Sequence, residues 1–404
     1  MSTRAAAAGI AKRCPSARAR ASRPQSSAAL SRLKSAKTPR SSWSRSAGRS
    51  GIPRVRELRC DAAGIGAPAV ATPPTAPDYP VGAVPFHIAQ HLRHRVRHAS
   101  RRLSSNLQVP WRRCDNVAQS QRVIGVTGAT GGVGGRVAAR LANRNEAMVL
   151  LCRNARRAPR LPGARVAVVG SYADSEGLRR ALRGVTTLFL VSAREAPDRL
   201  AHHVSAVDAA VACGVQRVVY LSFLSAAPAA TFTFARDHWA TEEHIRGSGL
   251  GFTFLRDSLY LDFMPQLVGA DGVVRGPAGD GRVAAVARDD VADVAAEVLT
   301  SSAHAGRTYD VTGCEAFTMR EMALTLAHFA RRDIRYQAET LEEARTSRRS
   351  SGAPDWEIEG WVTSYAAIAS GEMSVVSDTV TRIAGHLPLT LPQYLRTHPA
   401  ALPR

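Results

Sequence analysis

Apolar and polar positions along residues 121–404 follow a pattern of short buried strands that alternate with amphipathic helices. Apolar runs predict strands at 122–127, 147–152, 165–169, 187–191 and 217–221. Apolar residues at helical spacing predict a helix through Val137 and Leu141, and further helices over 175–183 and 198–213. Because strands and helices alternate at this period, we predict an α/β fold with a Rossmann-type doubly wound parallel sheet.

The later residues predict further elements and a smaller lobe. A strand begins at Arg282 and is followed by a helix over 291–300, which Asp289 or Asp290 is expected to cap. Another strand is predicted at 307–312, and helices are predicted at 318–330, at 341–349 and from Asp355 onward. We predict a smaller C-terminal substrate lobe, formed mainly by residues 256–285 and 336–404.

Three residues of the last long helix recur at helical spacing, namely Trp361, Tyr365 and Ile368. Such a stripe usually indicates core packing. The alternative is an aromatic surface that covers a bound acceptor and excludes water.

Charge divides the chain into two parts. The formal net charge of +21 over 404 residues is, taken whole, typical of a nucleic-acid binder. Residues 1–120 hold 22 basic and 4 acidic side chains, whereas residues 121–404 hold 32 and 29. Leu, Ile, Val and Phe make up only 18 of the first 120 residues, which is too few for a packed core. We therefore predict a disordered basic tail at 1–120 and a near-neutral domain at 121–404 that has no nucleic-acid partner.

Three interpretations of the tail remain open. Its Arg-, Ser-, Ala- and Pro-rich composition is compatible with a transit peptide. Its arginines between Arg93 and Arg102 are compatible with an arm that binds nucleic acid. The third interpretation is an extension ahead of the natural start of translation, which would then fall near Val117 or Val123.

Cysteine and histidine spacing bears on metals and compartment. The six cysteines, at positions 14, 60, 114, 152, 213 and 314, show no paired spacing. The histidines at 202, 203, 238 and 244 show no metal-binding motif. We therefore expect no disulfide framework and no metal, and a reducing compartment, either the cytoplasm or an organelle if the tail is a transit peptide. No apolar run reaches 18 residues, so no membrane span is predicted.

A glycine-rich turn follows the first predicted strand directly. It contains Gly128, Thr130, Gly131 and Gly134, and a helical pattern begins just after it. The first glycine permits the tight turn, the second lets the backbone approach a pyrophosphate, and the third allows close packing of helix and strand. The helix N-terminus offers unpaired N–H groups to the anion. This arrangement predicts a dinucleotide-binding site.

The residues after the second strand indicate which dinucleotide is bound. An NAD enzyme places a carboxylate there to hold the ribose diol, whereas this chain has Arg153, followed by Arg156 and Arg157. Guanidinium groups pair with a 2′-phosphate. We therefore expect NADP(H) in preference to NAD(H), with a solvated loop as the alternative reading. Ligands in such sheets lie at the carboxyl ends of the strands, which adds Ser192 and Ser222 to the candidate site.

With these residues, the chain resembles the NmrA-like branch of the atypical short-chain dehydrogenases/reductases, and within it the flavin-free NAD(P)H:quinone oxidoreductase type. The resemblance covers about residues 122–396. Beyond the glycine turn and Arg153, it rests on three segments: 190–192, 238–253 and 256–260. It implies NADPH without flavin or metal, and a nicotinamide pocket near Ser192, Phe223, His238 and residues 257–260, which include Ser258 and Tyr260.

The chain lacks the pair that reduces ordinary ketones in this superfamily. A Tyr-xxx-Lys pair lets the lysine lower the pKa of the tyrosine. All lysines of this chain, at positions 12, 34 and 37, lie in the tail. Reduction of a quinone needs fewer catalytic groups, because a quinone is intrinsically electrophilic. It needs mainly alignment with the nicotinamide and a source of a proton.

His238 is the predicted proton donor, and Tyr260 and Ser222 are predicted to orient the acceptor. The alternative for His238 is a surface or helix-capping histidine, and the alternative for Ser222 and Tyr260 is packing at a strand end.

Two functions remain open at this stage. The first is an NADPH-dependent oxidoreductase that transfers hydride to a quinone or a similar electron-poor conjugated acceptor. The alternative is a non-catalytic NADP(H)-sensing regulatory protein that binds a protein partner. A homodimer is compatible with either function.

Overall fold

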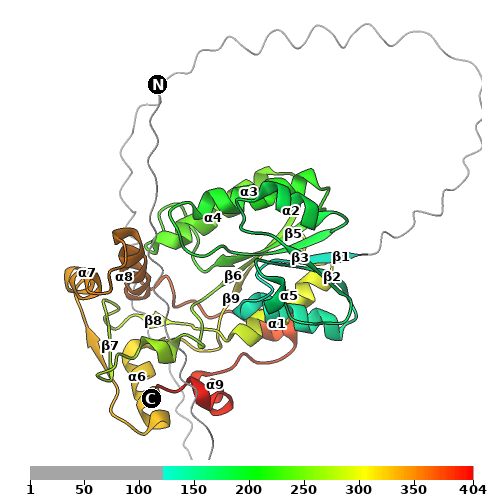
Figure 1. Ribbon diagram of the computed structural model, residues 1–404. Coiled ribbons are helices and arrows are strands. Elements are labelled where there is room, and N and C mark those ends of the chain that lie inside the picture. Colours follow the sequence, from blue (N-terminus) through cyan, green and yellow to red (C-terminus); the bar gives the residue numbers. More distant parts are fainter. Residues whose placement is uncertain (1–121, 404) are drawn as a thin grey trace, which may run out of the picture. The chain divides into compact units, whose positions relative to one another are not determined.

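The computed structural model describes residues 122–403, so the predicted tail at residues 1–120 lies outside the described part of the chain. The described residues contain a seven-stranded parallel sheet in the order β3-β2-β1-β4-β5-β6-β9 (Figure 1). Its strands are β1 (Val123–Val126), β2 (Ala147–Cys152), β3 (Ala164–Val168), β4 (Thr187–Val191), β5 (Arg217–Phe223), β6 (Gly251–Asp257) and β9 (Arg307–Val311). The order reverses beside β1, which opens a crevice at the carboxyl ends of β1 and β4. The predicted Rossmann-type fold is confirmed.

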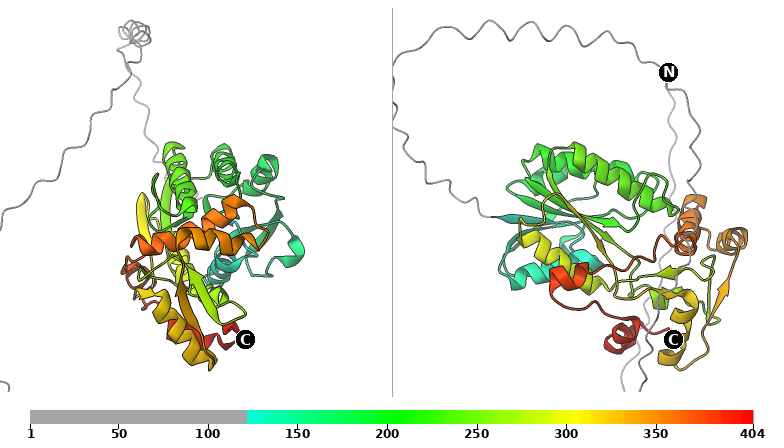
Figure 2. Two further views of the ribbon diagram at one scale, coloured as in Figure 1. Left: turned by 90° about the vertical axis from the view of Figure 1, so that its left-hand side faces the viewer. Right: turned by 180° about the vertical axis from the view of Figure 1, so that it is seen from behind.

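Helices cover both faces of this sheet (Figures 1 and 2). One face carries α1 (Gly132–Asn143) and α5 (Arg288–Thr300), and the other carries α2 (Ser175–Leu182), α3 (Arg199–Ala212) and α4 (Thr233–Gly247). Each face has its own buried core. Leu141 and Val294 pack against Phe189 on the first face, and Leu182 and Val207 pack against Tyr220 on the second.

The residues after β6 build a smaller second part, seen at the lower left of Figure 1. It contains two small sheets, one of β7 (Val273–Gly276) with β11 (Arg335–Ala338) and one of β8 (Arg282–Val283) with β10 (Phe317–Thr318). Its helices are α6 (Met319–Ala330), α7 (Leu341–Arg349), α8 (Asp355–Ala369) and α9 (Leu391–Thr397). Short helical turns lie at η1 (Ala155–Arg157), η2 (Met264–Leu267), η3 (Val380–Ala384) and η4 (Pro399–Ala401).

The aromatic stripe of α8 contributes to the core of this second part. Tyr365 and Ile368 are buried there together with Phe234 of α4 and Met264 of η2. Trp361 packs instead against a small separate cluster between α7 and α8. The core-packing interpretation of Tyr365 and Ile368 therefore holds.

The predicted cap of α5 is wrong. The helix begins at Arg288, so Asp289 and Asp290 lie inside its first turn rather than ahead of it. The carboxylate that accepts the backbone N–H of Arg288, at 3.0 Å, belongs to Asp262, 26 residues earlier. Sequence spacing cannot reveal a cap supplied by such a distant residue.

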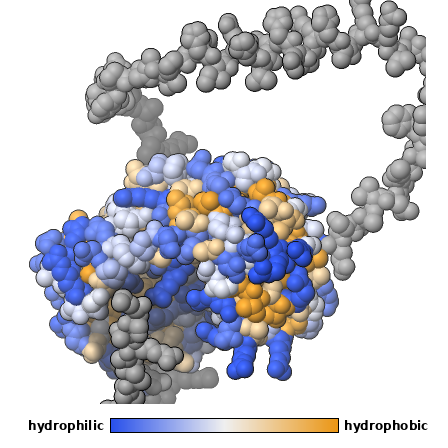
Figure 3. Space-filling view, turned by 45° about the horizontal axis from the view of Figure 1, so that its top comes forward, coloured by the Kyte–Doolittle hydropathy of each residue, from blue (hydrophilic) through white to orange (hydrophobic). Residues whose placement is uncertain are grey.

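The surface mixes hydrophilic and apolar residues, and Figure 3 shows both on one face. The most exposed large apolar side chains include Val168 on the edge strand β3, Leu324 on α6 and Leu387. None of the helices in residues 122–403 is long and apolar enough to cross a membrane.

Two glycines of the turn between β1 and α1 allow the close packing and the backbone conformation found there. A Cβ atom at Gly134 would lie 2.4 Å from the carbonyl oxygen of Gly128 and 2.7 Å from that of Thr127. Helix α1 therefore packs directly on the end of β1, which no other residue type permits. Gly128 has a φ of 60°, in the left-handed region that favours glycine.

We predict that Gly134→Ala lowers the free energy of unfolding by about 1 to 3 kcal/mol, because the added methyl forces α1 away from β1. Gly247→Ala is the matched control, since a Cβ atom there meets nothing within 4 Å. Urea unfolding of both variants measures the difference. Equal stability of the two variants would contradict the close-packing role of Gly134.

Candidate functional site

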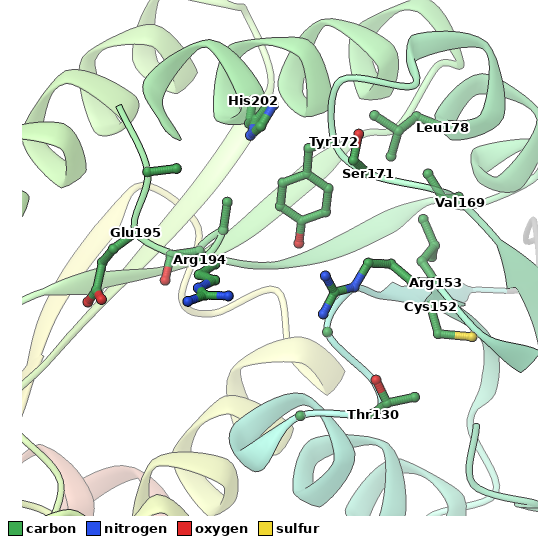
Figure 4. A pocket seen from close by; sticks show the side chains of 16 residues that line it. Thr130, Cys152, Arg153, Val169, Ser171, Tyr172, Leu178, Arg194, Glu195 and His202 are labelled. Carbon is green, nitrogen blue, oxygen red and sulfur yellow. The ribbon is translucent and has the colours of Figure 1, made fainter. Parts of the chain in front are cut away.

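A cavity of about 340 Å³ lies at the carboxyl edge of the sheet (Figure 4). Its walls come from the glycine turn, from the ends of β2 and β4, and from the loop after β3. Five of the predicted cofactor-binding residues line it, namely Gly128, Thr130, Gly131, Arg153 and Ser192. These residues follow β1, β2 and β4, and their predicted role in binding a cofactor stays a prediction.

The floor of the cavity offers an anion-binding helix end. The cap residue of α1 is Gly131, which has no side chain to accept a hydrogen bond from the first turn. No acceptor within the described residues takes the backbone N–H groups of Gly132 and Val133. Unpaired N–H groups and the positive end of the helix dipole favour a phosphate there.

Two arginines face the cavity from different walls. Figure 4 shows Arg153, after β2, and Arg194, after β4, with both guanidinium groups directed into the space between them. Neither guanidinium has a hydrogen bond or an ion pair within the described residues. Both are therefore available to an anionic group of a bound molecule.

Hydrogen bonds fix the wall beside β4. The Tyr172 hydroxyl donates to the Val191 carbonyl at 2.8 Å, and the Val191 amide donates to the Thr127 hydroxyl at 2.8 Å. Burial raises the pKa of Tyr172, so its hydroxyl keeps its proton. These bonds tie the end of β4 to the end of β1 and to the loop after β3.

A buried network holds the next residue, Ala193. Its amide donates to Nε2 of His203 at 2.8 Å, and its carbonyl accepts from Nε of Arg199 at 3.1 Å. Both side chains come from α3 and are buried. The backbone N–H and the carbonyl of Ala193 are therefore both bonded to side chains of α3. These bonds fix the part of the cavity wall that carries Ser192 and Arg194.

His238 belongs to this network rather than to the cavity surface. It is 5% exposed, its Nε2 atom lies 2.8 Å from an Arg199 nitrogen, and its Nδ1 atom lies 2.9 Å from the Tyr220 hydroxyl. Because a guanidinium only donates, Nε2 accepts and Nδ1 carries the proton. Burial, followed by the Arg199 charge, lowers the pKa of His238 well below 6.5. These contacts do not support the predicted role as proton donor, which stays a prediction; they show a positioning role.

The remaining predicted residues lie outside the cavity lining. Ser222 is fully buried, and its hydroxyl donates to Glu242 at 2.6 Å, so its place is in the salt-bridged core beside Arg256. Gly134 packs against the turn from within α1. Ser258 is 1% exposed, and its Oγ atom has no hydrogen-bond partner within the described residues. The cofactor contacts predicted for Ser222 and Ser258 stay predictions.

Tyr260 has a carboxyl partner that sequence reasoning missed. Its hydroxyl donates to the carboxylate of Asp257, at the end of β6. Burial raises the pKa of Asp257 to about 7, and burial, followed by the Asp257 charge, raises the pKa of Tyr260. The Arg288 guanidinium lies over the Tyr260 ring, 4.5 Å from its centroid. Tyr260 and Asp257 thus form a hydrogen-bonded pair at the end of β6, and the catalytic role predicted for Tyr260 stays a prediction.

Sequence reasoning also missed Arg194, Arg199 and Arg288. Arg194 follows Ser192 closely, so its position after a strand end was a usable signal. Arg199 lies in the first turn of a predicted helix and Arg288 lies just ahead of another, and nothing in the sequence pattern distinguishes them from solvated charges.

One group of potential metal ligands occurs in residues 122–403, namely Asp290, Asp293 and His386. Arg140 already pairs with Asp293 at 2.6 Å, and the Leu389 amide donates to Asp290 at 2.9 Å. These contacts explain the group as a link between α1, α5 and the segment before α9.

A doubly wound sheet with a glycine turn, an uncapped first helix and a cavity across its switch point defines a dinucleotide-binding protein. The comparison with protein families agrees with this class. A family described as NAD(P)H-binding matches residues 128–302.

Related proteins define the family more closely. Quinone oxidoreductase 2 of Escherichia coli is 31% identical over 275 residues, which are 67% of this chain and 96% of that protein. The (4-alkanoyl-5-oxo-2,5-dihydrofuran-3-yl)methyl phosphate reductase of Streptomyces griseus is 37% identical over 268 residues, 65% of this chain and 93% of that protein. The crystal structure of the Escherichia coli enzyme with NADPH superposes with a TM-score of 0.63 and 30% identity, covering 68% of this chain and 99% of that one.

The chain belongs to the NmrA-like family of NAD(P)H-binding short-chain dehydrogenases/reductases, with the quinone oxidoreductases among its relatives. It is an NAD(P)H-dependent oxidoreductase.

The buried imidazoles predict an acid-sensitive fold. Burial lowers the pKa of His203 from 6.5 to about 3, and that of His238 falls as well. Below pH 6.5 the unfolded chain therefore binds protons that the folded chain does not, and the free energy of unfolding falls on acidification. Each imidazole contributes about 1.4 kcal/mol per pH unit. The raised pKa of Asp257 opposes this trend between about pH 4 and 7, since its folded form keeps a proton.

We predict that His203→Gln reduces the slope of stability against pH between pH 6.5 and 4.5 by about 1.4 kcal/mol per pH unit. The glutamine oxygen still accepts from the Ala193 amide, so the contact is retained while the titrating group is lost. Urea unfolding at several pH values measures the slope. The same slope in wild type and variant would show that His203 titrates normally.

Proposed function

We propose that this protein is an NADPH-dependent reductase that transfers hydride to a quinone or to a similar electron-poor conjugated small molecule. The observation that carries this proposal is the cavity at the sheet edge, where a glycine turn and the unpaired Arg153 guanidinium face one another (Figure 4). NADPH, when bound, supplies the hydride.

The residues present fit this cofactor. The uncapped N-terminus of α1 suits the pyrophosphate, and a Cβ atom at Gly134 would fill the space in which α1 approaches β1. Arg153 follows β2, where the adenosine ribose of a Rossmann ligand lies. No acidic residue lines this cavity at the end of β2, so nothing there repels a 2′-phosphate.

Arg194 lies across the cavity from Arg153 and adds a second positive charge to the lining, beside Glu195. A 2′-phosphate bound between two guanidiniums gains charge-assisted hydrogen bonds. This supports NADPH over NADH.

The chain's own groups suit an acceptor that is already electrophilic. Residues 121–404 contain no lysine, so the pKa of a tyrosine cannot be lowered by an adjacent ammonium group. Tyr260 instead shares its proton with Asp257, whose pKa near 7 lets it hold a proton at neutral pH. With Asp257 protonated, its carboxyl donates to the Tyr260 oxygen, which frees the hydroxyl proton for an acceptor oxygen. Of the two predicted catalytic residues, His238 and Tyr260, the proposal therefore keeps Tyr260 as the proton donor.

The second part of the fold fits a role in excluding water. Its core joins Phe234 of α4 to Tyr365 of α8 and to Leu261, which directly follows the Tyr260 segment. Dry surroundings strengthen the electrostatic contacts of a bound acceptor. Two relatives support a conjugated acceptor, one named for quinones and the other for an alkanoyl-dihydrofuranone phosphate.

The first experiment mixes the full chain with NADPH and a panel of quinones and follows the loss of absorbance of the reduced nicotinamide. We expect oxidation that depends on the quinone. Tight NADPH binding without such oxidation would favour the alternative, a non-catalytic sensor of NADP(H) that acts on a protein partner.

A second experiment tests the cofactor preference. Arg153→Glu should raise the KM for NADPH by about 100-fold, since it removes a charge-assisted pair and adds a repulsive charge, while the KM for NADH changes little. Arg165→Glu on β3 is the matched control, because Arg165 is exposed and does not line the cavity. Equal losses for NADPH and NADH would show that Arg153 does not hold the 2′-phosphate.

A further inference from the structure

Arg288, the first residue of α5, lies against the first turn of α1. A Cβ atom built on Gly132 would be 3.0 Å from Cδ and 3.1 Å from Nε of Arg288. The guanidinium stem therefore runs over the backbone at the point where the glycine turn presents its unpaired N–H groups. Any larger residue at position 132 would displace this side chain.

Three contacts hold Arg288 in this position. Its backbone N–H donates to Oδ2 of Asp262 at 3.0 Å, and its NH1 atom lies 3.6 Å from Oδ1 of the same carboxylate. Its guanidinium also stacks on the Tyr260 ring at 4.5 Å. Asp262 is itself buried, so the arginine is oriented before any ligand arrives.

The N–H groups of the Arg288 guanidinium nevertheless remain available as hydrogen-bond donors. None of its N–H groups makes a hydrogen bond with residues 122–403, and its side chain is 28% exposed. The neighbouring arginines of α1 do make hydrogen bonds with protein groups. Arg136 and Arg140 donate to Asp289 and Asp293 of α5, and these ion pairs join the two helices.

The position of Arg288 also opposes the helix dipole. The first turn of a helix favours acidic side chains, and a cation there is unfavourable. Arg288 breaks this local rule beside the unpaired N–H groups of the glycine turn, and its guanidinium N–H groups, which make no hydrogen bond within residues 122–403, are available to a ligand there.

We infer that Arg288 binds the diphosphate of the dinucleotide, on the side opposite the N–H groups of the glycine turn. The inference rests on the proposed cofactor site and deepens it. A diphosphate carries two negative charges, whereas the turn itself offers only neutral N–H groups and a helix dipole. Arg288 supplies the cationic side chain that the turn lacks. Arg153 and Arg288 then divide the cofactor between them, the first at the 2′-phosphate and the second at the diphosphate.

Two nucleotide fragments separate these roles in the full-length protein. ADP-ribose has the diphosphate and no 2′-phosphate, and adenosine 2′-monophosphate has the 2′-phosphate and no diphosphate. We expect Arg288→Ala to raise the Kd for ADP-ribose at least 10-fold, measured by calorimetry, and to leave that for adenosine 2′-monophosphate within twofold. Arg153→Glu should do the reverse. Arg288→Lys should lose less than Arg288→Ala, because it keeps the charge but not the fork of donors.

Arg282→Ala is the matched control, since Arg282 is an exposed arginine that pairs with Glu321. Retained binding of adenosine 2′-monophosphate by Arg288→Ala shows that the variant is folded. An unchanged Kd for ADP-ribose in Arg288→Ala overturns the inference, even where NADPH binding and turnover are normal. A wild type that binds adenosine 2′-monophosphate but not ADP-ribose overturns it as well. If the wild type binds ADP-ribose alone, the NADPH preference fails, and the Arg288 variants still decide the inference.

Discussion

The approach of α1 to the end of β1 is the contact on which the site depends. It exists because Gly134 has no Cβ atom to meet the Gly128 carbonyl. The approach directs the unpaired N–H groups of the first helical turn toward the sheet edge, and it lets α5 pack beside α1 with its own first residue at the same edge. The position of the unpaired N–H groups follows from this one close contact between backbones, whereas Arg288 is held beside them by Asp262 and Tyr260.

The opposite wall is held by a different principle, namely buried polar groups with complete partners. Arg199, His203 and His238 lie beneath the loop after β4 and use their ring and guanidinium nitrogens on Ala193, Thr241 and Tyr220. An unpartnered buried polar group is costly, so such a network favours one arrangement of the loop. The buried neutral imidazoles make the wall rigid at neutral pH, and their suppressed protonation makes it sensitive to acid.

The sequence was sufficient for features set by local pattern and insufficient for those set by distant partners. Strand and helix alternation predicted the sheet, and the glycine turn with Arg153 predicted one side of the cavity, because these signals lie within a few residues of one another. His238 looked like a solvent-reachable histidine, since its partners Arg199 and Tyr220 come from other elements. Asp257 read as one acid in a strand-end segment, and only packing shows that it is buried beside Tyr260. The cap of α5 failed for the same reason, because Asp262 is close in space only.

The missing lysine connects these observations. In a site with an ammonium group near the reacting tyrosine, the tyrosine pKa falls and ordinary carbonyls come within reach. Here the Tyr260 pKa rises, because the hydroxyl is buried and because the negative charge of Asp257 lies beside it. Arg288 offsets part of this effect from the face of the ring, but its charge is shared with Asp262. In the proposed function, such a site donates a proton from a neutral pair and stabilises little negative charge itself. It therefore suits acceptors whose own conjugation spreads the charge that hydride transfer creates, which is the property that quinones and unsaturated lactones have in common.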